Sequence, residues 1–455
     1  MVKQMPIPFW TNPSVLTLSG DRDPVEAITA EARAIVFRAL ERGWQGPPFD
    51  PFALAELLSI ETLPTTEVLD ARTVPVGGNR FRIEFNPDRP RRRIRYSIFH
   101  EIAHTLLPDC AQMIRNRAVH NASRPDDWQL ETLCNIAAAE FLLPTGALGP
   151  VSNLRPSVEA ILELRERYEA SAEAALLRIR RLTTEPAMAF SCHRDAASGR
   201  YVIEYATPTA GANWSLRPGW MLPARTAAAE CTAIGYTAKQ TEHWSQFGKV
   251  RVECVGVAPF PRDIYPRVIG FVRPSELQPV EQPSITYLRG DATQPRGPDR
   301  KLLVQVVNDA AFTWGGGGFA AAVKRRWPSA QKAFTAQVTV DRSRLRLGSV
   351  VTCDVEPDVT VLNLVAQRGY GASPHPRIRY GALRDCLLRV SEMAKEWNAS
   401  VHMPRIGTGQ AGGSWPVVEE IICETLTKVG VKVSVYDLPQ GRERPKAQGD
   451  LPLTK

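Results

Sequence analysis

The stretch RYSIFHEIAH, residues 95–104, decides the fold of the N-terminal part of this chain. Its apolar residues continue past the motif and predict one helix that is closed by Pro108. His100 and His104 are about 40° apart around a helix, so both imidazoles face one spot. That spot suits Zn²⁺ with a carboxylate as third ligand and one position open for water. Glu101 is placed to take a proton from that water, so the pattern predicts a zinc hydrolase, most often a peptidase.

A second helix offers the carboxylate. The stretch LETLCNIAAAEFLL, residues 130–143, is mostly small and apolar, and Pro144 ends it. Glu131 and Asn135 share one face of this helix, whereas Glu140 points to the opposite side. We predict Glu131 as the third metal ligand. Two alternatives stay open: Glu131 only favours the helix N-terminus electrostatically, or Glu140 is the ligand.

Together these helices resemble the ImmA/IrrE metallopeptidase family over about residues 25–185. That family pairs an R-[FY]-[ST]-x-x-H-E-x-x-H helix with an E-x-x-x-N-x-F-A-A-x-[FL]-L-x-P helix. Ala137 stands where the family usually has Phe, which concerns packing rather than chemistry. The resemblance implies a zincin-like helical metallopeptidase lobe in which His100, His104 and Glu131 hold Zn²⁺ and Glu101 is the general base. It also implies a regulatory protein as substrate, for example a helix-turn-helix repressor, cut in response to stress or mobile-element signals.

Composition fits a soluble intracellular enzyme. The 455 residues suffice for about three domains, and the formal net charge of +8 is a mild basic excess. Eight cysteines are scattered without a CxxC pair, which indicates reduced core residues. No N-terminal apolar region and no run of about 18 apolar residues occurs. We therefore expect a cytoplasmic protein with no membrane partner.

Arginines crowd just ahead of the zinc motif, where positive charge opposes the helix dipole. They are Arg89, Arg91, Arg92, Arg93 and Arg95. We favour a solvated turn for this run. An acidic partner or a nucleic-acid backbone is the alternative, so a nucleic-acid partner stays open.

The middle of the chain is less informative. Residues 157–182 show the periodicity of two helices broken at Ala170-Ser171, which either form a helix-turn-helix or complete the peptidase lobe. Residues 187–272 contain short β-prone runs such as 201–205 and 249–255, and predict a small mixed α/β domain of unassigned role. The Pro-rich residues 273–283 predict a linker.

Beyond the linker, strands and helices alternate. Residues 302–307, 359–365 and 431–436 predict strands, and residues 320–326, 380–397 and 415–429 predict helices, which indicates a three-layer α/β/α unit. Glycine-rich turns at residues 314–319 and 407–413 each follow a strand and precede a helix. Glycine lets backbone N–H groups approach a phosphate closely, so two such turns favour a diphosphate ligand.

This unit resembles the macrodomain, the ADP-ribose-binding fold, over about residues 284–438. The resemblance rests on GDAT at residues 290–293, on both glycine-rich turns, and on NLVAQ and IRYGAL at residues 363–367 and 378–383, which are similar to macrodomains that process ADP-ribose-1″-phosphate. It implies that Asp291 binds the adenine amine. The other implied ADP-ribose-binding residues are Asn308, Asp309, Gly315, Gly316, Gly317, Gly318, Phe319, Gly407, Thr408, Gly409, Gln410, Ala411 and Gly412.

Departures from that pattern bear on catalysis. Ala310 and Ala311 stand where many de-ADP-ribosylating macrodomains carry a second Asn, and Gln367 and Ala411 stand near the positions of a Lys–Asp pair used by another hydrolase group. We therefore favour a reader of ADP-ribose over an eraser. Acid–base candidates remain, although a loop position for His375 and a structural role on a strand edge for His402 are the simpler interpretations. These candidates are Asp309, His375 and His402.

Taken together, the sequence predicts a multidomain α+β and α/β protein. The expected divisions are a metallopeptidase domain (1–185), a small sheet-containing domain (186–272), a linker (273–283), a macrodomain (284–440) and a flexible tail (441–455). We expect a zinc-dependent endopeptidase coupled to an ADP-ribose-sensing macrodomain, in stress response or defence against mobile elements. The alternative is an ADP-ribosyl or ADP-ribose-phosphate hydrolase with an accessory N-terminal domain, and a third hypothesis is a DNA-associated regulator.

Overall fold

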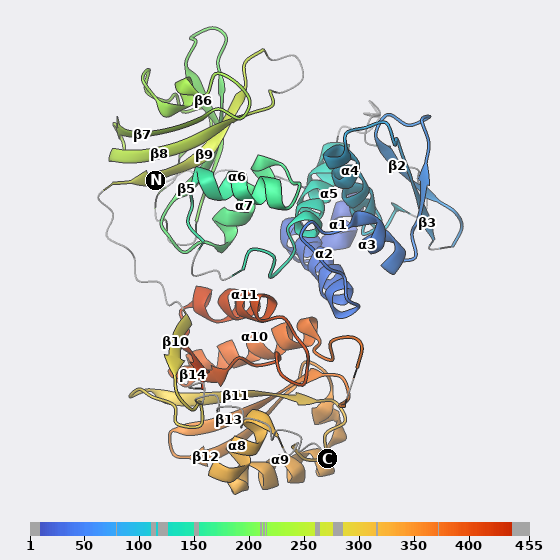
Figure 1. Ribbon diagram of the computed structural model, residues 1–455, viewed down its shortest axis with the longest axis vertical. Helices are drawn as coiled ribbons and strands as arrows, with labels where there is room; N and C mark the ends of the chain where they lie inside the picture. Colours follow the sequence, from blue (N-terminus) through green and yellow to red (C-terminus); the bar gives the residue numbers. More distant parts are fainter. Residues whose placement is uncertain are drawn as a thin grey trace, which may run out of the picture.

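The computed structural model describes residues 10–78, 80–110, 115–116, 126–149, 154–209, 212, 214, 216–259, 264–275, 285–314, 317–371 and 373–438. These residues form three units that follow one another along the chain, each with its own β-sheet (Figure 1). Within the described part of the chain, the helices are too short or too polar to cross a bilayer.

Helices dominate the first unit, and three of them begin in the same way. Asn12, Asp23 and Asp50 each accept backbone N–H groups of the first turn, and a proline occupies the first helical position. Both features stabilise a helix N-terminus. The helices of this unit are α1 (Pro13–Ser19), α2 (Pro24–Glu41), α3 (Pro51–Leu57), α4 (Arg91–His104), α5 (Asp127–Leu142), α6 (Val158–Arg167) and α7 (Ala172–Leu182).

A four-stranded sheet, which the sequence does not predict, accompanies the helices of this helix-rich unit. Its order is β1-β3-β2-β4, and β1 pairs with β3 in parallel. The strands have two to five residues, too few for a clear alternation of apolar and polar positions. They are β1 (Glu61–Pro64), β2 (Ala71–Pro75), β3 (Phe81–Phe85) and β4 (Arg115–Asn116).

The break between α6 and α7 falls where the sequence predicts it, and the Ser171 side chain caps α7. Ile161 of α6 and Leu176 of α7 belong to the same buried core as the helices of the first unit. That core also reaches Ile269 and Phe271 of the second sheet. The two helices therefore complete the first unit and attach it to the next, instead of standing apart as a helix-turn-helix.

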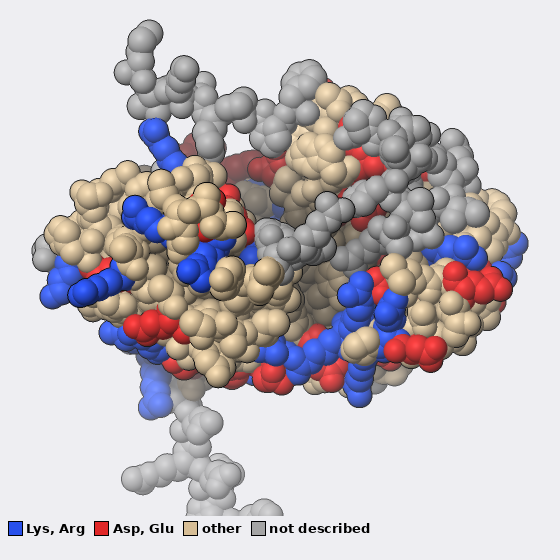
Figure 2. All heavy atoms as spheres, turned by 90° about the horizontal axis from the view of Figure 1, so that it is seen from above, with Lys and Arg blue, Asp and Glu red and all other residues tan. Residues whose placement is uncertain are grey.

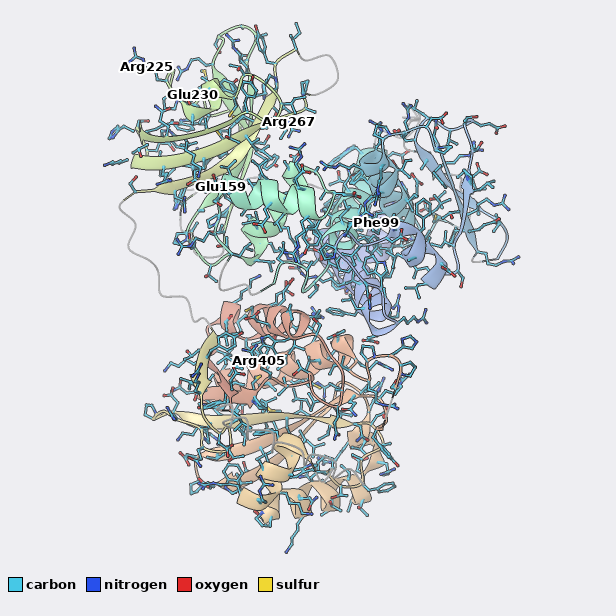
Figure 3. The ribbon with its side chains drawn as sticks, viewed as in Figure 1. Phe99, Glu159, Arg225, Glu230, Arg267 and Arg405 are labelled. Atoms are coloured by element: carbon cyan, nitrogen blue, oxygen red, sulfur yellow. The ribbon has the colours of Figure 1, made fainter. Side chains whose placement is uncertain are left out.

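One antiparallel sheet makes up most of the second unit, with the order β6-β5-β9-β8-β7. Its described residues contain a single short 3-10 helix (Ala227–Glu230), so a mixed α/β domain is the wrong expectation here. Arg267, labelled in Figure 3, ties the sheet to α7 through Glu173, with Nη2 3.0 Å from Oε1. The strands are β5 (Met188–Arg194), β6 (Tyr201–Pro208), β7 (Thr237–Trp244), β8 (Gly248–Val257) and β9 (Arg267–Pro274).

The predicted linker begins inside β9, which runs to Pro274. Most of the remaining linker residues, 276–283, lie outside the described residues, as do the predicted tail 441–455 and two residues of the first glycine-rich turn, Gly315 and Gly316.

In the third unit, a six-stranded sheet lies between two layers of helices. Its order is β10-β15-β14-β11-β13-β12, and only the edge strand β12 runs antiparallel to its neighbour. One buried core joins the sheet to α10 and α11, and another joins it to α8 and α9. The strands are β10 (Ile285–Arg289), β11 (Arg300–Asn308), β12 (Val350–Glu356), β13 (Val359–Gln367), β14 (Ala399–Pro404) and β15 (Val433–Asp437).

The helices of this unit differ from expectation in two places. The sequence predicts one helix over residues 415–429, but α11 ends at Thr425 and a 3-10 helix (Thr427–Val429) follows. A helix from Pro328 to Val340 was not predicted. The helices are α8 (Gly318–Arg326), α9 (Pro328–Val340), α10 (Tyr380–Glu396) and α11 (Trp415–Thr425), with a 3-10 turn at Arg342–Leu345.

Helices α10 and α11 lie on the side of the third unit that faces the other two (Figure 1). Phe37 of α2 belongs to the core beneath α10 and packs 6.0 Å from the Tyr380 ring. The neighbouring Glu41 accepts the backbone N–H of Tyr380 at 2.8 Å. Helix α2 therefore joins the first unit to the third.

A buried group of charges completes this junction. Arg33 of α2 holds the Glu424 carboxylate with two nitrogens at 2.8 and 2.7 Å, and its Nε lies 3.2 Å from Glu140 of α5. Arg178 of α7 donates to Glu420 of α11 at 2.5 Å. Burial alone would lower the pKa of Arg178, but the attraction of Glu420 raises it. Two helices of the first unit, α2 and α7, thus contact α11 through ion pairs, and Glu140 of α5 also pairs with Arg33.

Candidate functional site

The two predicted metal-binding histidines are fully buried on α4. His100 and His104 are 0 % exposed, and their ring centroids lie 4.8 Å apart. Helix α4 begins at Arg91 and ends at His104, before the predicted stop at Pro108. The spacing of four residues therefore sets both rings on the same side of the helix, as expected.

Glu131 of α5 meets both rings. Its Oε2 is 3.0 Å from Nε2 of His100, and its Oε1 is 3.4 Å from Nε2 of His104. A tetrahedral zinc site with bonds of about 2.1 Å separates its ligand atoms by about 3.4 Å. Among the described residues these three side chains are the group that could hold a metal ion. Two imidazoles and one carboxylate at this separation fit Zn²⁺ and leave a fourth position for water.

Glu140 lies elsewhere. Nine residues after Glu131 on the same helix, it is buried against Arg33 and Arg181 in the junction with the third unit. The alternative in which Glu140 is the metal ligand does not fit this position.

Glu101 is fully buried beside the two histidines. The Thr73 hydroxyl lies 2.7 Å from Oε2 of Glu101 and 3.0 Å from its backbone oxygen. Thr73 belongs to β2 and is 0 % exposed, so it holds the Glu101 side chain in one orientation. Sequence reasoning missed Thr73 because it lies 28 residues upstream in a short strand without a motif.

Two further contacts surround the metal-binding side chains. Sγ of Cys134 lies 3.3 Å from Nδ1 of His104. If Nε2 ligated a metal, Nδ1 would carry the proton and donate it to sulfur, and this contact would hold the ring in place. Tyr96 Oη donates to Oδ1 of Asn135 at 2.5 Å, one turn along α5 from Glu131. Helical spacing in the sequence identifies Asn135, but nothing in it identifies the role of Cys134.

The predicted solvated turn at the arginines ahead of the motif is wrong, because α4 begins at Arg91 and includes four of them. Three carboxylates from other segments pair with the five arginines and offset part of their charge. The pairs join Arg89 and Arg93 to Asp70, Arg92 to Glu166, and Arg91 and Arg95 to Glu169. On the face of the molecule shown in Figure 2, basic and acidic side chains are interspersed, without a large area of one sign among the described residues. Neither observation favours a nucleic-acid partner.

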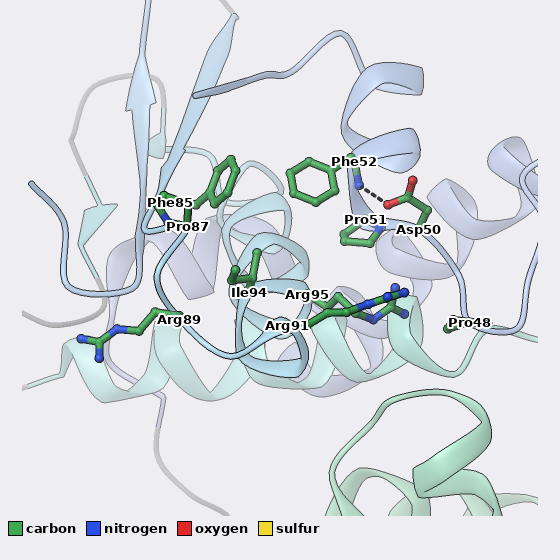
Figure 4. Close-up of a pocket in the computed structure, with 10 residues that line it drawn as sticks. All are labelled: Pro48, Asp50, Pro51, Phe52, Phe85, Pro87, Arg89, Arg91, Ile94 and Arg95. Atoms are coloured by element: carbon green, nitrogen blue, oxygen red, sulfur yellow. Dashed lines mark hydrogen bonds between the residues drawn. The ribbon is translucent and has the colours of Figure 1, made fainter. Parts of the chain in front are cut away.

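A cavity of about 590 Å³ opens at this end of α4. Figure 4 shows the Phe52 and Phe85 rings facing each other above Ile94, with the Arg91 and Arg95 side chains extending to one side. The centroids of the two rings are 5.3 Å apart, and the rings meet edge to face. Arg95, the lining residue of α4 nearest to His100, lies five residues or about 8 Å before it along the helix, and no metal-binding side chain lines this cavity.

In the third unit, the two glycine-rich turns face each other. A Cβ atom on Gly317 would lie 3.7 Å from Nε2 of Gln410, which belongs to the second turn. Gly407 and Gly412 have φ of 73° and 68°, a region that favours glycine. Asp309 Oδ1 accepts the backbone N–H of Gly369 at 2.9 Å, and Asp291 Oδ1 accepts that of Thr293 at 2.9 Å. The structure thus brings the predicted ligand-binding turns together at the ends of β11 and β14.

The two histidines among the acid–base candidates, His402 and His375, lie in different surroundings. His402 lies on β14, an interior strand between β15 and β11, so the expected strand edge is wrong. It is 1 % exposed, and burial lowers its pKa to about 4. His375 is exposed and lies in a loop. Its Nδ1 would lie 3.7 Å from a Cβ atom built on Gly43 of the first unit. Neither histidine lies in the two glycine-rich turns.

Comparison with known proteins identifies the first unit. The profile of the IrrE N-terminal-like domain matches residues 63–180. Over 173 residues the chain is 27 % identical to the radiation response metalloprotease IrrE of Deinococcus radiodurans, covering 34 % of this chain and 52 % of that protein.

Other relatives match the third unit. The chain is 29 % identical over 160 residues to a DNA ADP-ribosyl glycohydrolase of Thermus aquaticus, covering 34 % of this chain and 41 % of that protein. A solved macrodomain protein from Streptomyces coelicolor is 42 % identical, with 34 % of this chain and 99 % of that chain covered and a TM-score of 0.30. The chain thus spans about half or less of the two curated relatives named here.

Proposed function

Since this chain carries an IrrE N-terminal-like domain and a macrodomain, we propose that it is a zinc-dependent endopeptidase whose macrodomain senses an ADP-ribose-type ligand. The observation that carries the proposal is the arrangement of His100, His104 and Glu131 around one point, with Glu101 beside them. The substrate is a regulatory protein, and the setting is stress response or defence against mobile elements.

His100, His104 and Glu131 would hold the zinc ion, which supplies Lewis acidity toward water and the scissile carbonyl when bound. Glu101 accepts the proton of the attacking water and then passes it to the leaving amine. Thr73 keeps the Glu101 carboxylate in the orientation that this transfer needs. Cys134 fixes the His104 ring through its second nitrogen.

The sensing part of the proposal rests on the opposed glycine-rich turns. Backbone N–H groups of Gly317, Gly318 and the second turn are suited to the diphosphate, and Asp291 to the adenine amine. We assign the metallopeptidase domain to residues 1–185, the sheet domain to 186–272 and the macrodomain to 284–440.

A second candidate function is ADP-ribosyl hydrolysis, which the similarity to a DNA ADP-ribosyl glycohydrolase favours. Release of free ADP-ribose from ADP-ribosylated DNA or peptide by the Glu101→Gln protein would support that activity. Binding without release would support the sensor.

The peptidase proposal is tested by comparing wild type with Glu101→Gln in cells, with cleavage products identified by mass spectrometry. We expect new protein termini only with wild type, because an amide cannot accept the proton of water. Glu101→Gln should retain about one zinc per chain, whereas His104→Ala should lose it, since two ligands hold the ion poorly. Metal content unchanged in His104→Ala would refute the zinc assignment.

The sensor proposal is tested by calorimetry of the full chain with ADP-ribose. Asp291→Ala should weaken binding by about 1.5–3 kcal/mol through loss of a charge-assisted hydrogen bond. Asp354→Ala, on an exposed side chain of β12, is the matched control and should bind as wild type does. Gly409→Leu should fold, because its Cβ meets no atom within 4 Å, and should block the ligand. If calorimetry detects no heat of binding between the wild-type protein and ADP-ribose, the proposal that the macrodomain senses this ligand is wrong.

A further inference from the structure

A cleft of about 920 Å³ lies where the first unit meets the macrodomain. Side chains of α2, α5 and α7 line it, and Arg384 of α10 closes the macrodomain side. Its central wall is apolar, with Ala30, Ile136, Ala139 and Leu177. The volume is at the upper end of the range of about 300–1,000 Å³ that ligand pockets span, so the cleft accommodates several residues of a peptide.

Positive charge prevails along this cleft, with five arginines against two glutamates. Glu140 and Glu424 hold two of these arginines, as described for the junction. Arg178 is paired with Glu420 but keeps unused donors, and Arg180 and Arg384 have no carboxylate partner within the described part of the chain. Arg180 donates to the Pro208 carbonyl at 2.9 Å and has no carboxylate partner there. Arg384 has neither a hydrogen bond nor an ion pair with a described residue, and Nε and Nη1 of the buried Arg178 have no partner among them.

These unused donors point to an anionic ligand. Burial lowers the pKa of Arg180, which reflects the loss of hydration around its charge. A half-buried guanidinium without a counter-charge is unfavourable, and an incoming carboxylate restores the missing interaction. The apolar wall between the arginines suits the aliphatic part of the same ligand.

One end of the cleft reaches the flank of the metal centre. Thr132 and Asn135 line it, and Asn135 lies one helical turn from Glu131 on the same face. Tyr96, which donates to Asn135, has its ring 6.0 Å from that of His100. The other end lies near Glu140, about 14 Å along α5 from Glu131. That span corresponds to about four residues of extended chain.

We propose that this cleft binds an extended, acidic segment of the protein substrate, about four residues from the bond that is cut. Carboxylates of the segment pair with Arg180 and Arg384, and its apolar side chains contact Ile136 and Leu177. The proposal rests on the peptidase function proposed above. Because Arg384 belongs to the macrodomain, the cleft is complete only while the macrodomain is docked on the first unit.

Binding is measured with the full-length Glu101→Gln protein, which does not consume the probe. The probes are two fluorescein-labelled octapeptides, one alternating Asp and Leu and one alternating Lys and Leu, followed by fluorescence anisotropy at physiological salt. We expect the acidic peptide to bind and the basic one not to. Adding Arg384→Glu should weaken the acidic peptide about tenfold or more and improve the basic one. Arg180→Gln should weaken the acidic peptide as well.

Arg389→Glu is the matched control, because it makes the same charge change on an exposed position of α10 outside the cleft. If Arg389→Glu weakens the acidic peptide as much as Arg384→Glu does, attraction is unspecific and the proposal is wrong. Equal affinity for both peptides also overturns it.

Cleavage of a randomised peptide library by the active, zinc-loaded chain separates this proposal from the one it rests on. We expect Asp and Glu to be enriched about four residues from the cut, and Arg384→Glu to shift that preference toward Lys and Arg. Cleavage without any charge preference overturns the cleft proposal and leaves the peptidase standing. Binding of the acidic peptide with no cleavage of library or protein contradicts the peptidase and leaves the cleft standing.

Discussion

His402 illustrates how partners remote in the sequence set the chemistry of a single side chain. Its Nδ1 lies 3.0 Å from the Tyr436 hydroxyl, whose oxygen also accepts the Arg296 N–H. Its Nε2 lies 2.9 Å from Ser400 Oγ, which in turn lies 3.4 Å from the Arg300 carbonyl. This chain of hydrogen bonds needs one donor and one acceptor on the ring, so it fits a neutral imidazole. A strand residue that looks available for acid–base work is therefore part of the buried framework.

His402 leads to a prediction on pH dependence. Burial holds its folded pKa at about 4, against 6.5 for the ordinary side chain. Between these values the unfolded chain binds a proton that the folded chain does not, so stability falls as the pH drops through this range. From pH 7 to pH 5 the free energy of unfolding should fall by about 2 kcal/mol through this residue. In the His402→Gln protein, this contribution to the fall of the free energy of unfolding should be absent.

The measurement is chemical denaturation of both proteins at the two pH values. Since other groups also titrate, the quantity to compare is the change in wild type minus the change in the variant. The same loss in both proteins would contradict a neutral buried His402.

Helix α5 contributes a glutamate to two different sites, one near each end of the helix. Near its start Glu131 contacts both histidines of the metal centre, and near its end Glu140 contacts arginines in the domain junction. Between them, Ala137 and Ala138 are small and 0 % exposed, so this side of the helix packs closely against its neighbours. One rigid element thus connects the metal centre to the contact surface of the macrodomain.

We predict separable effects of two isosteric changes on α5. Glu131→Gln should weaken zinc binding at least about tenfold, because the ion loses an anionic ligand. Glu140→Gln should keep the metal but lower the free energy of unfolding by about 3 kcal/mol, because Arg33 and Arg181 lose a buried counter-charge. Metal analysis and denaturation of each protein give the two readouts. Zinc lost from Glu140→Gln and kept by Glu131→Gln would show that the assignment of the third ligand is wrong.

At the scale of the whole molecule, one face of α11 holds the macrodomain against the first unit. Helix α11 begins directly after the second glycine-rich turn, and its Glu420 and Glu424 contact Arg178 and Arg33. Glu420 is 1 % exposed, and burial raises its pKa despite the attraction of Arg178. Lys428, just beyond α11, donates to the Arg181 carbonyl at 3.0 Å. The element that follows the predicted phosphate site is therefore the one that docks.

Removing one charge of this junction should loosen the docking. Glu420→Gln leaves Arg178 buried without its partner, a change that costs about 3–5 kcal/mol. We expect faster hydrogen exchange in α11 and α7 and a larger radius of gyration in X-ray scattering. Replacing both residues, as Arg178→Met with Glu420→Met, should recover much of the loss, because no charge is then left buried.

Asp437→Asn is the control, since it breaks an ion pair with Arg405 that lies at the surface and inside the macrodomain. It should change neither the exchange of α7 nor the radius of gyration. If Glu420→Gln behaves like this control, the ion pairs do not hold the two units together.

The sequence by itself determined what depends on local spacing. Four residues between His100 and His104 place both rings on one side of a helix whatever packs around it, and the same geometry separates Glu131 from Glu140. The alternation of apolar strands and helices after residue 300 likewise indicates layers of helices around a sheet. Most elements of the third unit follow from this pattern, and both glycine-rich turns are visible in the printed sequence.

Only the tertiary structure decided which remote segments meet. Thr73 sits in a strand too short to show a pattern, yet it contacts Glu101. The one carboxylate that pairs with both Arg91 and Arg95 is that of Glu169, in the loop after α6. In the sequence, the charges of α11 look like those of any exposed helix. In the structure, Arg33 and Arg178 of the first unit cover them. Long-range contacts of this kind depend on how whole units pack, and local propensity carries no information about that packing.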